Sequence, residues 1–124
     1  MVLPHRGNDV SMKDLKVMGD LGQVNLQFFD VRDYESVLRC VENSDVVVNL
    51  ISRDYKTFNF TIDDANHVAA RAIARAAKES NVARFIYTSC LPASEKSRVE
   101  YFKAKVSVSF IDDDEDVYFL LLHD

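Results

Sequence analysis

The chain has 124 residues and a net charge of −5, and 48% of its residues are apolar. This length and composition fit one globular domain with a buried core. No basic face typical of nucleic-acid-binding proteins stands out, and no apolar run approaches the length of a membrane span. The two cysteines show no spacing motif, which favours reduced thiols over a disulfide framework. No signal or transit peptide is recognisable, so either the protein is cytoplasmic or its true N-terminus lies upstream.

The first half of the chain alternates strand and helix patterns. Residues 1–4 resemble the end of a β-strand, in which Pro4 has no N–H for a ladder. A short helix is predicted over 12–18 and a weaker strand over 24–29. A second helix begins after Asp33, a plausible N-cap.

The second half carries the stronger signals. The β-branched run 46–51 predicts a strand buried on both faces. A helix is predicted from 63–64 to about 78 with a narrow alanine-rich face, and Asn81 suits a left-handed cap after it. A strand over 84–89 and a helix near 95–105 follow.

This β-α alternation predicts an α/β fold with a parallel sheet of the doubly wound Rossmann type. Residues 106–124 break the rhythm with an apolar stretch, an acidic run at 112–116 and a second apolar run. We therefore expect a partial Rossmann domain over 1–105 and a divergent acidic and apolar tail over 106–124.

The glycine-rich loop of such a fold is missing from the sequence. That loop follows the first, central strand and lets the backbone approach a pyrophosphate. Gly19 and Gly22 follow a helix and precede a strand, which indicates a helix stop and a turn. We expect the central strand and its loop to precede Met1, which leaves a gap in the sheet and makes this chain marginally stable or unfolded alone.

Polar residues at the predicted strand ends could read a nucleotide. Arg6 would pair with a 2′-phosphate, favouring NADP(H), or it is a solvated loop residue. Asp30 could accept from an adenine amino group, or it helps to cap the next helix. Asn49, within the most apolar strand, could face a ribose or tie two strands together.

Ser89, Tyr101 and Lys105 form the sharpest candidate catalytic set. A strand-end serine followed by Tyr-x-x-x-Lys on one helix face is the arrangement of short-chain dehydrogenases, where tyrosine moves a proton. A solvated helix face rich in lysine is the alternative. The three histidines show no metal-ligand spacing, so no metal site is expected.

Two segments, 14–23 and 43–60, go beyond generic patterning. With them, the chain from about Val2 to about Lys105 closely resembles the short-chain-dehydrogenase-like accessory subunits of mitochondrial respiratory complex I, of the alpha-subcomplex subunit nine type. The resemblance implies a domain that holds NADPH without turnover. It also implies a matrix-side position on the inner membrane, where the peripheral and membrane arms meet, with complex I subunits as partners and quinone or lipid nearby.

By the same resemblance, Arg6 lies near the adenosine phosphate and Asp30 at the adenine edge. Asn49, Leu50 and Ile51 form the strand that lines the cofactor. Ser89, Tyr101 and Lys105 match remnant active-site positions.

The sequence also departs from this family. The glycine loop is absent, Ser52 stands where the pattern usually has glycine, and the chain diverges after Lys105. We therefore expect a fragment, a splice product or a mistranslated gene model that binds the cofactor poorly. The genomic sequence flanking both ends would settle whether the chain is truncated. The alternatives are an NADP-dependent reductase or epimerase that uses Tyr101, a related factor in ubiquinone biosynthesis, and a redox-sensing regulator.

Overall fold

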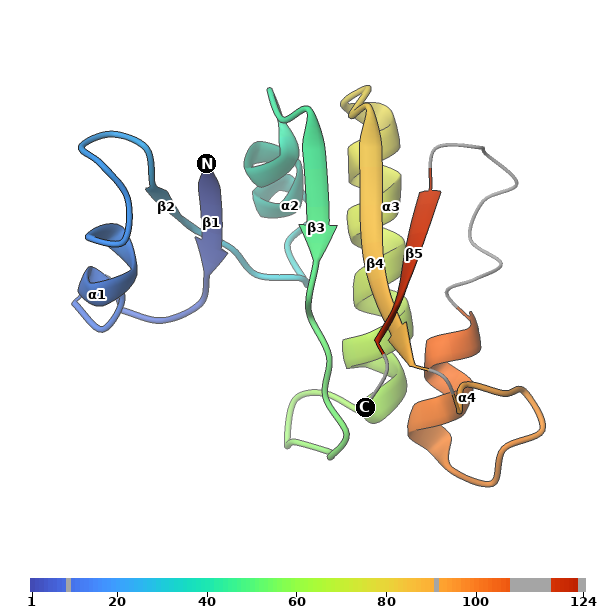
Figure 1. Cartoon of the computed structure of the whole chain (residues 1–124). Helices are drawn as coiled ribbons and strands as arrows, with labels where there is room; N and C mark the ends of the chain where they lie inside the picture. The colour runs from blue at the N-terminus through green and yellow to red at the C-terminus, as the bar shows by residue number, and fades with distance from the viewer. Residues whose placement is uncertain (9, 91, 108–116, 123–124) are drawn as a thin grey trace.

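The computed structural model describes residues 1–8, 10–90, 92–107 and 117–122, the last six and Ser107 by backbone alone. Strands and helices alternate along the chain, as the sequence predicts (Figure 1). In chain order the elements are β1 (Val2–His5), α1 (Lys13–Lys16), β2 (Asn25–Phe28), α2 (Tyr34–Val41), β3 (Val46–Asn49), the π-helical turn η1 (Asp64–Val68), α3 (Ala69–Glu79), β4 (Arg84–Cys90), α4 (Glu100–Ser107) and β5 (Val117–Leu122).

The strands form two parallel sheets instead of one. β1 pairs with β2, and β3, β4 and β5 pair in that order. Figure 1 shows β1 and β3 side by side and pointing the same way, with α2 and α3 on one side of them. No described strand lies between β1 and β3, so the predicted parallel α/β sheet with a gap at its centre is confirmed.

Backbone hydrogen bonds show which groups face this gap. The carbonyl of His5 accepts from the N–H of Phe29 at 2.9 Å, so the backbone N–H and C=O of His5 point toward β2. Polar groups of successive strand residues point to opposite edges, so those of Pro4 point toward the gap. On the other side, the carbonyl of Asp45 accepts from the N–H of Arg84 at 3.2 Å, which turns the polar groups of Val46 into the gap.

The hydrophobic core lies between the sheet strands and helices α2 and α3. Val37 and Ala76 are completely buried, and the predicted alanine-rich face of α3 packs inward. The other face of β3 is open, because 47% of Val46 and 54% of Val48 is exposed. The prediction that this strand is buried on both faces is therefore wrong for the described chain, in which no element covers the second face.

Local signals in the sequence explain several boundaries. Thr61 and Asp64 form a reciprocal capping box, in which each accepts a hydrogen bond from the other's backbone N–H. Asn81 adopts the predicted left-handed conformation with φ 52°, and Gly22 has φ 82° in the turn before β2. Asp33 precedes α2 as predicted but makes no side-chain capping bond.

Within the predicted tail over 106–124, the structure describes a fifth strand, β5. β5 runs parallel to β4 along its whole length and extends the sheet, as the next strand of an alternating fold would. A continuous apolar run of six residues suits a strand, and this strand pairs with the outer edge of β4. The acidic run at 112–116 lies outside the described residues. In the part that is described, no helix combines the length and apolarity needed to cross a membrane.

Candidate functional site

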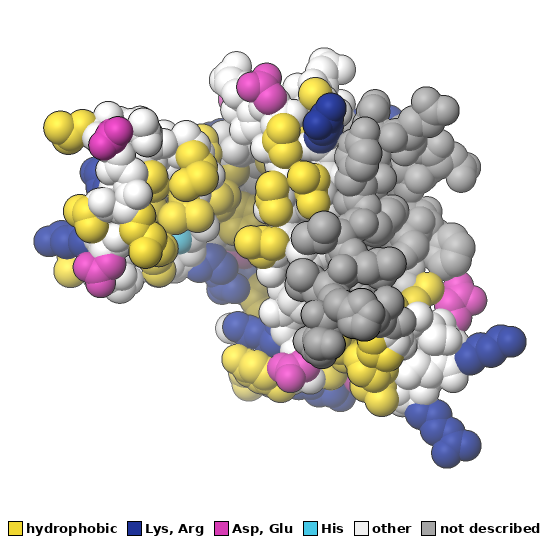
Figure 2. Space-filling view, viewed as in Figure 1, with side chains coloured by type: hydrophobic (Ala, Val, Ile, Leu, Met, Phe, Trp, Pro, Cys, Tyr) yellow, Lys and Arg dark blue, Asp and Glu magenta, His cyan; other side chains and the backbone are white. Residues whose placement is uncertain are grey.

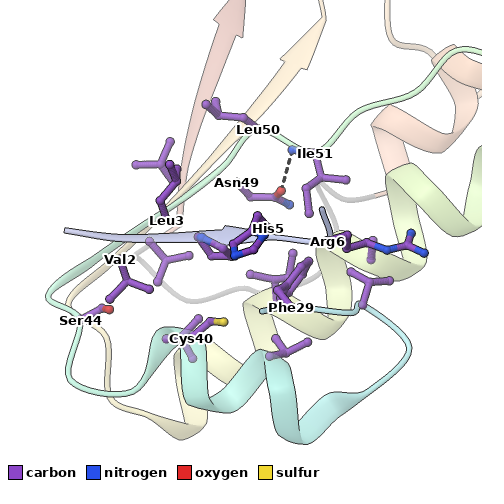
Figure 3. Close-up of a pocket in the computed structure, with 18 of the residues that line it drawn as sticks. Val2, Leu3, His5, Arg6, Phe29, Cys40, Ser44, Asn49, Leu50 and Ile51 are labelled. Carbon is purple, nitrogen blue, oxygen red and sulfur yellow. Dashed lines mark hydrogen bonds between the residues drawn. The ribbon is translucent and has the colours of Figure 1, made fainter. Parts of the chain in front are cut away.

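A groove of about 930 Å³ lies between β1 and β3, where the two sheets fail to meet. Its floor is apolar and is built largely by side chains of α2 and α3, among them Val37, Cys40 and Ile73. Figure 3 shows that β1 and the segment around Asn49 face each other across it. Of the predicted cofactor residues, the groove brings together Arg6, Asn49, Leu50 and Ile51.

Asn49 sits at the point where the β3–β4 ladder ends. If the ladder continued, the N–H of Ile51 would donate to the carbonyl of Thr88. Instead the Asn49 side-chain oxygen accepts from the N–H of Ile51 at 3.0 Å. Asn49 is only 3% exposed, and its Nδ2 has no hydrogen-bond partner in the described chain. This amide is therefore a buried donor on the wall of the groove.

Lys105, on α4, pairs with the backbone group that the end of the ladder leaves open on β4. Its Nζ donates to the freed carbonyl of Thr88 at 3.0 Å, and it lies 4.8 Å from the centre of the Tyr87 ring. The side chain is 2% exposed, and burial lowers the pKa of its ammonium group. The Ile51 N–H and the Thr88 carbonyl, which a longer ladder would have joined, are thus each satisfied by a side chain. The first is paired with Asn49 and the second with Lys105.

Arg6 and Arg32 flank the aromatic ring of Phe60 at the carboxyl end of the groove. Their guanidinium carbons lie 5.2 Å and 5.3 Å from the ring centre, within the range of cation–π attraction. Arg32 also holds the carboxylate of Asp30 through two hydrogen bonds of 3.2 Å and 2.8 Å. Arg6 makes no ion pair within the described part of the chain, so its charge is available to an anion.

The Asp30–Arg32 pair changes what Asp30 can do. Hydrogen bonds from Arg32 lower the pKa of the Asp30 carboxyl to about 2. The carboxylate is ionised at neutral pH and already occupied, and Asp30 is not among the residues that line the groove. An adenine amino group at this edge would have to share the carboxylate with Arg32.

The predicted catalytic residues are not joined by hydrogen bonds within the described residues. The Tyr101 hydroxyl is 3.0 Å from the Ser52 hydroxyl, on the loop after β3. The Lys105 Nζ is 5.7 Å from the centre of the Tyr101 ring, and Ser89, 8% exposed, makes no hydrogen bond to either. Tyr101 and Lys105 thus share one helix face, as predicted, but each contacts a structural partner.

Sequence reasoning missed Asn66 and Ser52. Asn66 is completely buried, and its side-chain oxygen accepts from the Ser52 hydroxyl and the Arg53 N–H, each at 3.2 Å. Its Nδ2 donates to the carbonyls of Arg53 and Ile62 at 2.6 Å and 2.7 Å. All four hydrogen-bonding positions of this amide are used, so it fixes the loop after β3 to the π-helical turn η1. The position of this asparagine inside an apolar helix pattern was the one feature of the sequence that could have indicated a buried, hydrogen-bonded side chain.

No model of a known protein family matches the chain. It is 44% identical over 105 residues to NADH dehydrogenase (ubiquinone) 1 alpha subcomplex subunit 9, mitochondrial, of Dictyostelium discoideum, covering 85% of this chain and 29% of that protein. The mouse protein of the same name is 41% identical, with 85% and 28% covered. The chain thus spans less than a third of the length of these curated relatives.

Solved structures share the fold at low sequence identity. An NADPH-dependent quinone oxidoreductase from Escherichia coli, complexed with NADPH, matches with a TM-score of 0.71 and 18% identity over 97% of this chain and 38% of that one. A Citrobacter triphenylmethane reductase complexed with NADP(H) matches with a TM-score of 0.65 and 14% identity over 89% and 34%. These likenesses show a Rossmann-type fold. Along its 105 aligned residues, this Rossmann-type chain is homologous to the mitochondrial alpha subcomplex subunit 9 proteins of NADH dehydrogenase.

Proposed function

We propose that this chain carries part of a non-catalytic, NADPH-holding accessory subunit of mitochondrial respiratory complex I. The observation that carries the proposal is the 44% identity over 105 residues, which is 85% of this chain. Its partners are then other complex I subunits, on the matrix side where the two arms of the complex meet, with quinone or lipid nearby. The open face of β3 and the free edges of β1 and β3 are consistent with a unit that is completed by further polypeptide.

The groove fits one end of NADPH better than the other. Arg6 supplies a free cation for a 2′-phosphate, and the Asn49 amide supplies a buried donor for a ribose hydroxyl. A pyrophosphate needs a cluster of backbone N–H groups at a glycine turn and a helix N-terminus. Of the three glycines, Gly19 and Gly22 lie in the turn before β2 and Gly7 in the loop after β1, so none follows a central strand.

We therefore expect weak binding of NADPH by this chain alone. Isothermal titration calorimetry should give a Kd no tighter than about 1 mM, because only adenosine-end contacts are available. The matched titration with NADH should be weaker still, since it lacks the phosphate that Arg6 would hold. Stoichiometric, tight uptake of NADPH by these 124 residues would contradict the proposal that the phosphate-binding part is missing.

The absence of turnover is part of the same proposal. Proton transfer by tyrosine in a Tyr-x-x-x-Lys arrangement needs a lysine ammonium close to the hydroxyl. Here the Lys105 ammonium is held by the Thr88 carbonyl, and the Tyr101 hydroxyl is held by Ser52. These contacts support a structural role for both residues.

Association with complex I can be tested in mitochondria. We expect an epitope-tagged chain, directed to the matrix by a foreign targeting sequence, to co-migrate in part with complex I on blue native gels. The Tyr87→Ala variant, expected to be unfolded, is the control for non-specific trapping. If the tagged chain migrates only as free polypeptide, or if the control co-migrates equally, the proposed complex I role is wrong.

A further inference from the structure

We propose that Phe60 is a positioning residue for the recognition of a nucleotide 2′-phosphate, because its ring holds the Arg6 guanidinium at the carboxyl end of the groove. The inference rests on the proposed function, in which Arg6 binds that phosphate. Phe60 lies in the loop between β3 and η1, far from Arg6 in the sequence, so the two side chains meet only in the folded chain.

Arg6 has few contacts that could hold its side chain in one place. It directly follows β1, it is exposed, and it makes no ion pair within the part of the chain that the structure describes. A long exposed arginine samples many rotamers, and fixing it when a ligand binds costs conformational entropy. The Phe60 ring, whose centre is 5.2 Å from the guanidinium carbon, limits this freedom without using any of the N–H donors. The donors therefore stay available for a phosphate.

Phe60 is itself fixed by its neighbours in the chain. Its carbonyl accepts from the backbone N–H of Thr57 at 2.9 Å and from the Thr57 hydroxyl at 3.4 Å. The next residue, Thr61, belongs to the capping box with Asp64 that begins η1. Phe60 is half-buried and lines the groove. Its ring is thus a fixed surface against which a mobile arginine can rest.

Arg32 also lies over this ring, but its charge is already matched. Its guanidinium carbon is 5.3 Å from the ring centre, and its Nη2 is 2.8 Å from the Asp30 carboxylate. Hydrogen bonds from Arg32 lower the pKa of Asp30 most, and the charge of Arg6 lowers it further, so Arg6 lies near this pair. Figure 2 shows Lys and Arg side chains beside the hollow between the two parts of the molecule, toward the end at which β1 and β3 terminate. In this cluster of two cations and one anion, the uncompensated charge is that of Arg6.

The alternative role for Phe60 is direct stacking on the adenine ring. A stacking ring would help every adenosine ligand alike, whether or not the ligand carries a 2′-phosphate. A ring that positions Arg6 would help only the ligands that carry this phosphate. Two ligands that differ in the 2′-phosphate alone therefore separate the two roles.

The test compares adenosine 2′,5′-bisphosphate with adenosine 5′-monophosphate in NMR titrations of the isotope-labelled chain. NMR measures millimolar affinities, and the ratio of the two Kd values gives the preference for the 2′-phosphate. We expect Phe60→Leu to reduce this preference about fivefold and to change the Kd of the monophosphate by less than about twofold. A fivefold change corresponds to about 1 kcal/mol, the size of a cation–π contact at an exposed site.

Two further variants show whether Phe60 acts through Arg6. Phe58→Leu is the matched control, since Phe58 is fully exposed in the same loop and neither Arg6 nor Arg32 lies over its ring. It should keep the preference. Arg6→Met should abolish the preference, and in that background Phe60→Leu should have no further effect on it.

A measurement on the unaltered chain covers the case in which Phe60→Leu does not fold. The separation of 5.2 Å predicts nuclear Overhauser contacts between the Phe60 ring protons and the side-chain protons of Arg6. Phe60→Tyr keeps an aromatic ring at this position. It should keep both the contacts and the preference for the bisphosphate.

Four results would overturn the inference. They are an unchanged preference in Phe60→Leu, an equal loss of affinity for both ligands, a further loss of preference in the Arg6→Met background, and the absence of the Overhauser contacts. A preference that Arg6→Met removes and Phe60→Leu leaves intact would sink this inference alone. An unaltered chain that prefers neither ligand would contradict the proposed binding of NADPH as well.

Discussion

Replacing Asn66 by alanine is expected to destabilise the chain by about 2–4 kcal/mol. The substitution removes four hydrogen bonds of a completely buried side chain and leaves the carbonyls of Arg53 and Ile62 without this donor. Each buried polar group left unpaired costs about 1–3 kcal/mol, partly relieved here because the loop after β3 can reach water. Urea denaturation followed by far-UV circular dichroism measures the change.

Asn59 provides the matched control for Asn66. It is an exposed asparagine in the same loop region and makes no side-chain hydrogen bond in the described chain. Asn59→Ala should change the free energy of unfolding by less than about 0.5 kcal/mol. Equal effects of the two substitutions would mean that the loop after β3 is not anchored through Asn66.

Replacing Tyr87 by alanine is expected to unfold the chain at 25 °C. Tyr87 is completely buried in β4, and large aromatic-to-alanine changes in a core cost about 3–5 kcal/mol. The change also strips the ring from beside the buried Lys105 ammonium, which lies 4.8 Å from its centre. A domain without its central ladder starts near the low end of the usual 5–15 kcal/mol, so this loss would remove most of its stability.

Tyr55 is the control for this prediction because 60% of its surface is exposed. The Arg53 guanidinium carbon lies 5.0 Å from the centre of its ring, a pairing worth at most about 1 kcal/mol at an exposed site. Near-UV circular dichroism and calorimetry should show a folded Tyr55→Ala chain and an unfolded Tyr87→Ala chain. A cooperative transition that survives Tyr87→Ala with little change would show that β4 is not the centre of the core.

The sequence was sufficient for most of the secondary structure, since hydrophobic periodicity reports local structure. The β-branched run before Asn49 and the alanine-rich face of α3 both fold as predicted. The gap was predictable as well, because a missing glycine turn implies a missing central strand. Burial of β3 on both faces was not correctly predicted, since the pattern of a strand reports the complete fold and not this stretch of it.

Contacts between distant elements could not be predicted. The Ser52–Tyr101 hydrogen bond joins residues 49 positions apart, and the bond from Lys105 to Thr88 exists only because the β3–β4 ladder stops short. A Tyr-x-x-x-Lys spacing cannot show whether its lysine is near the tyrosine hydroxyl or is used elsewhere. Likewise, a free Arg6 and an occupied Asp30 look alike in the sequence, although Arg32 distinguishes them in the structure.

Amide hydrogen exchange of β3, followed by NMR, tests the open sheet most directly. The N–H groups of Val47 and Asn49 point toward β4, whereas those of Val46 and Val48 point into the gap. We predict that protection alternates along the strand, with Val48 exchanging at least about tenfold faster than Val47 and Asn49. Equal protection of all these amides would mean that the inner edge of β3 is already paired, and it would contradict the account of a sheet that lacks its central strand.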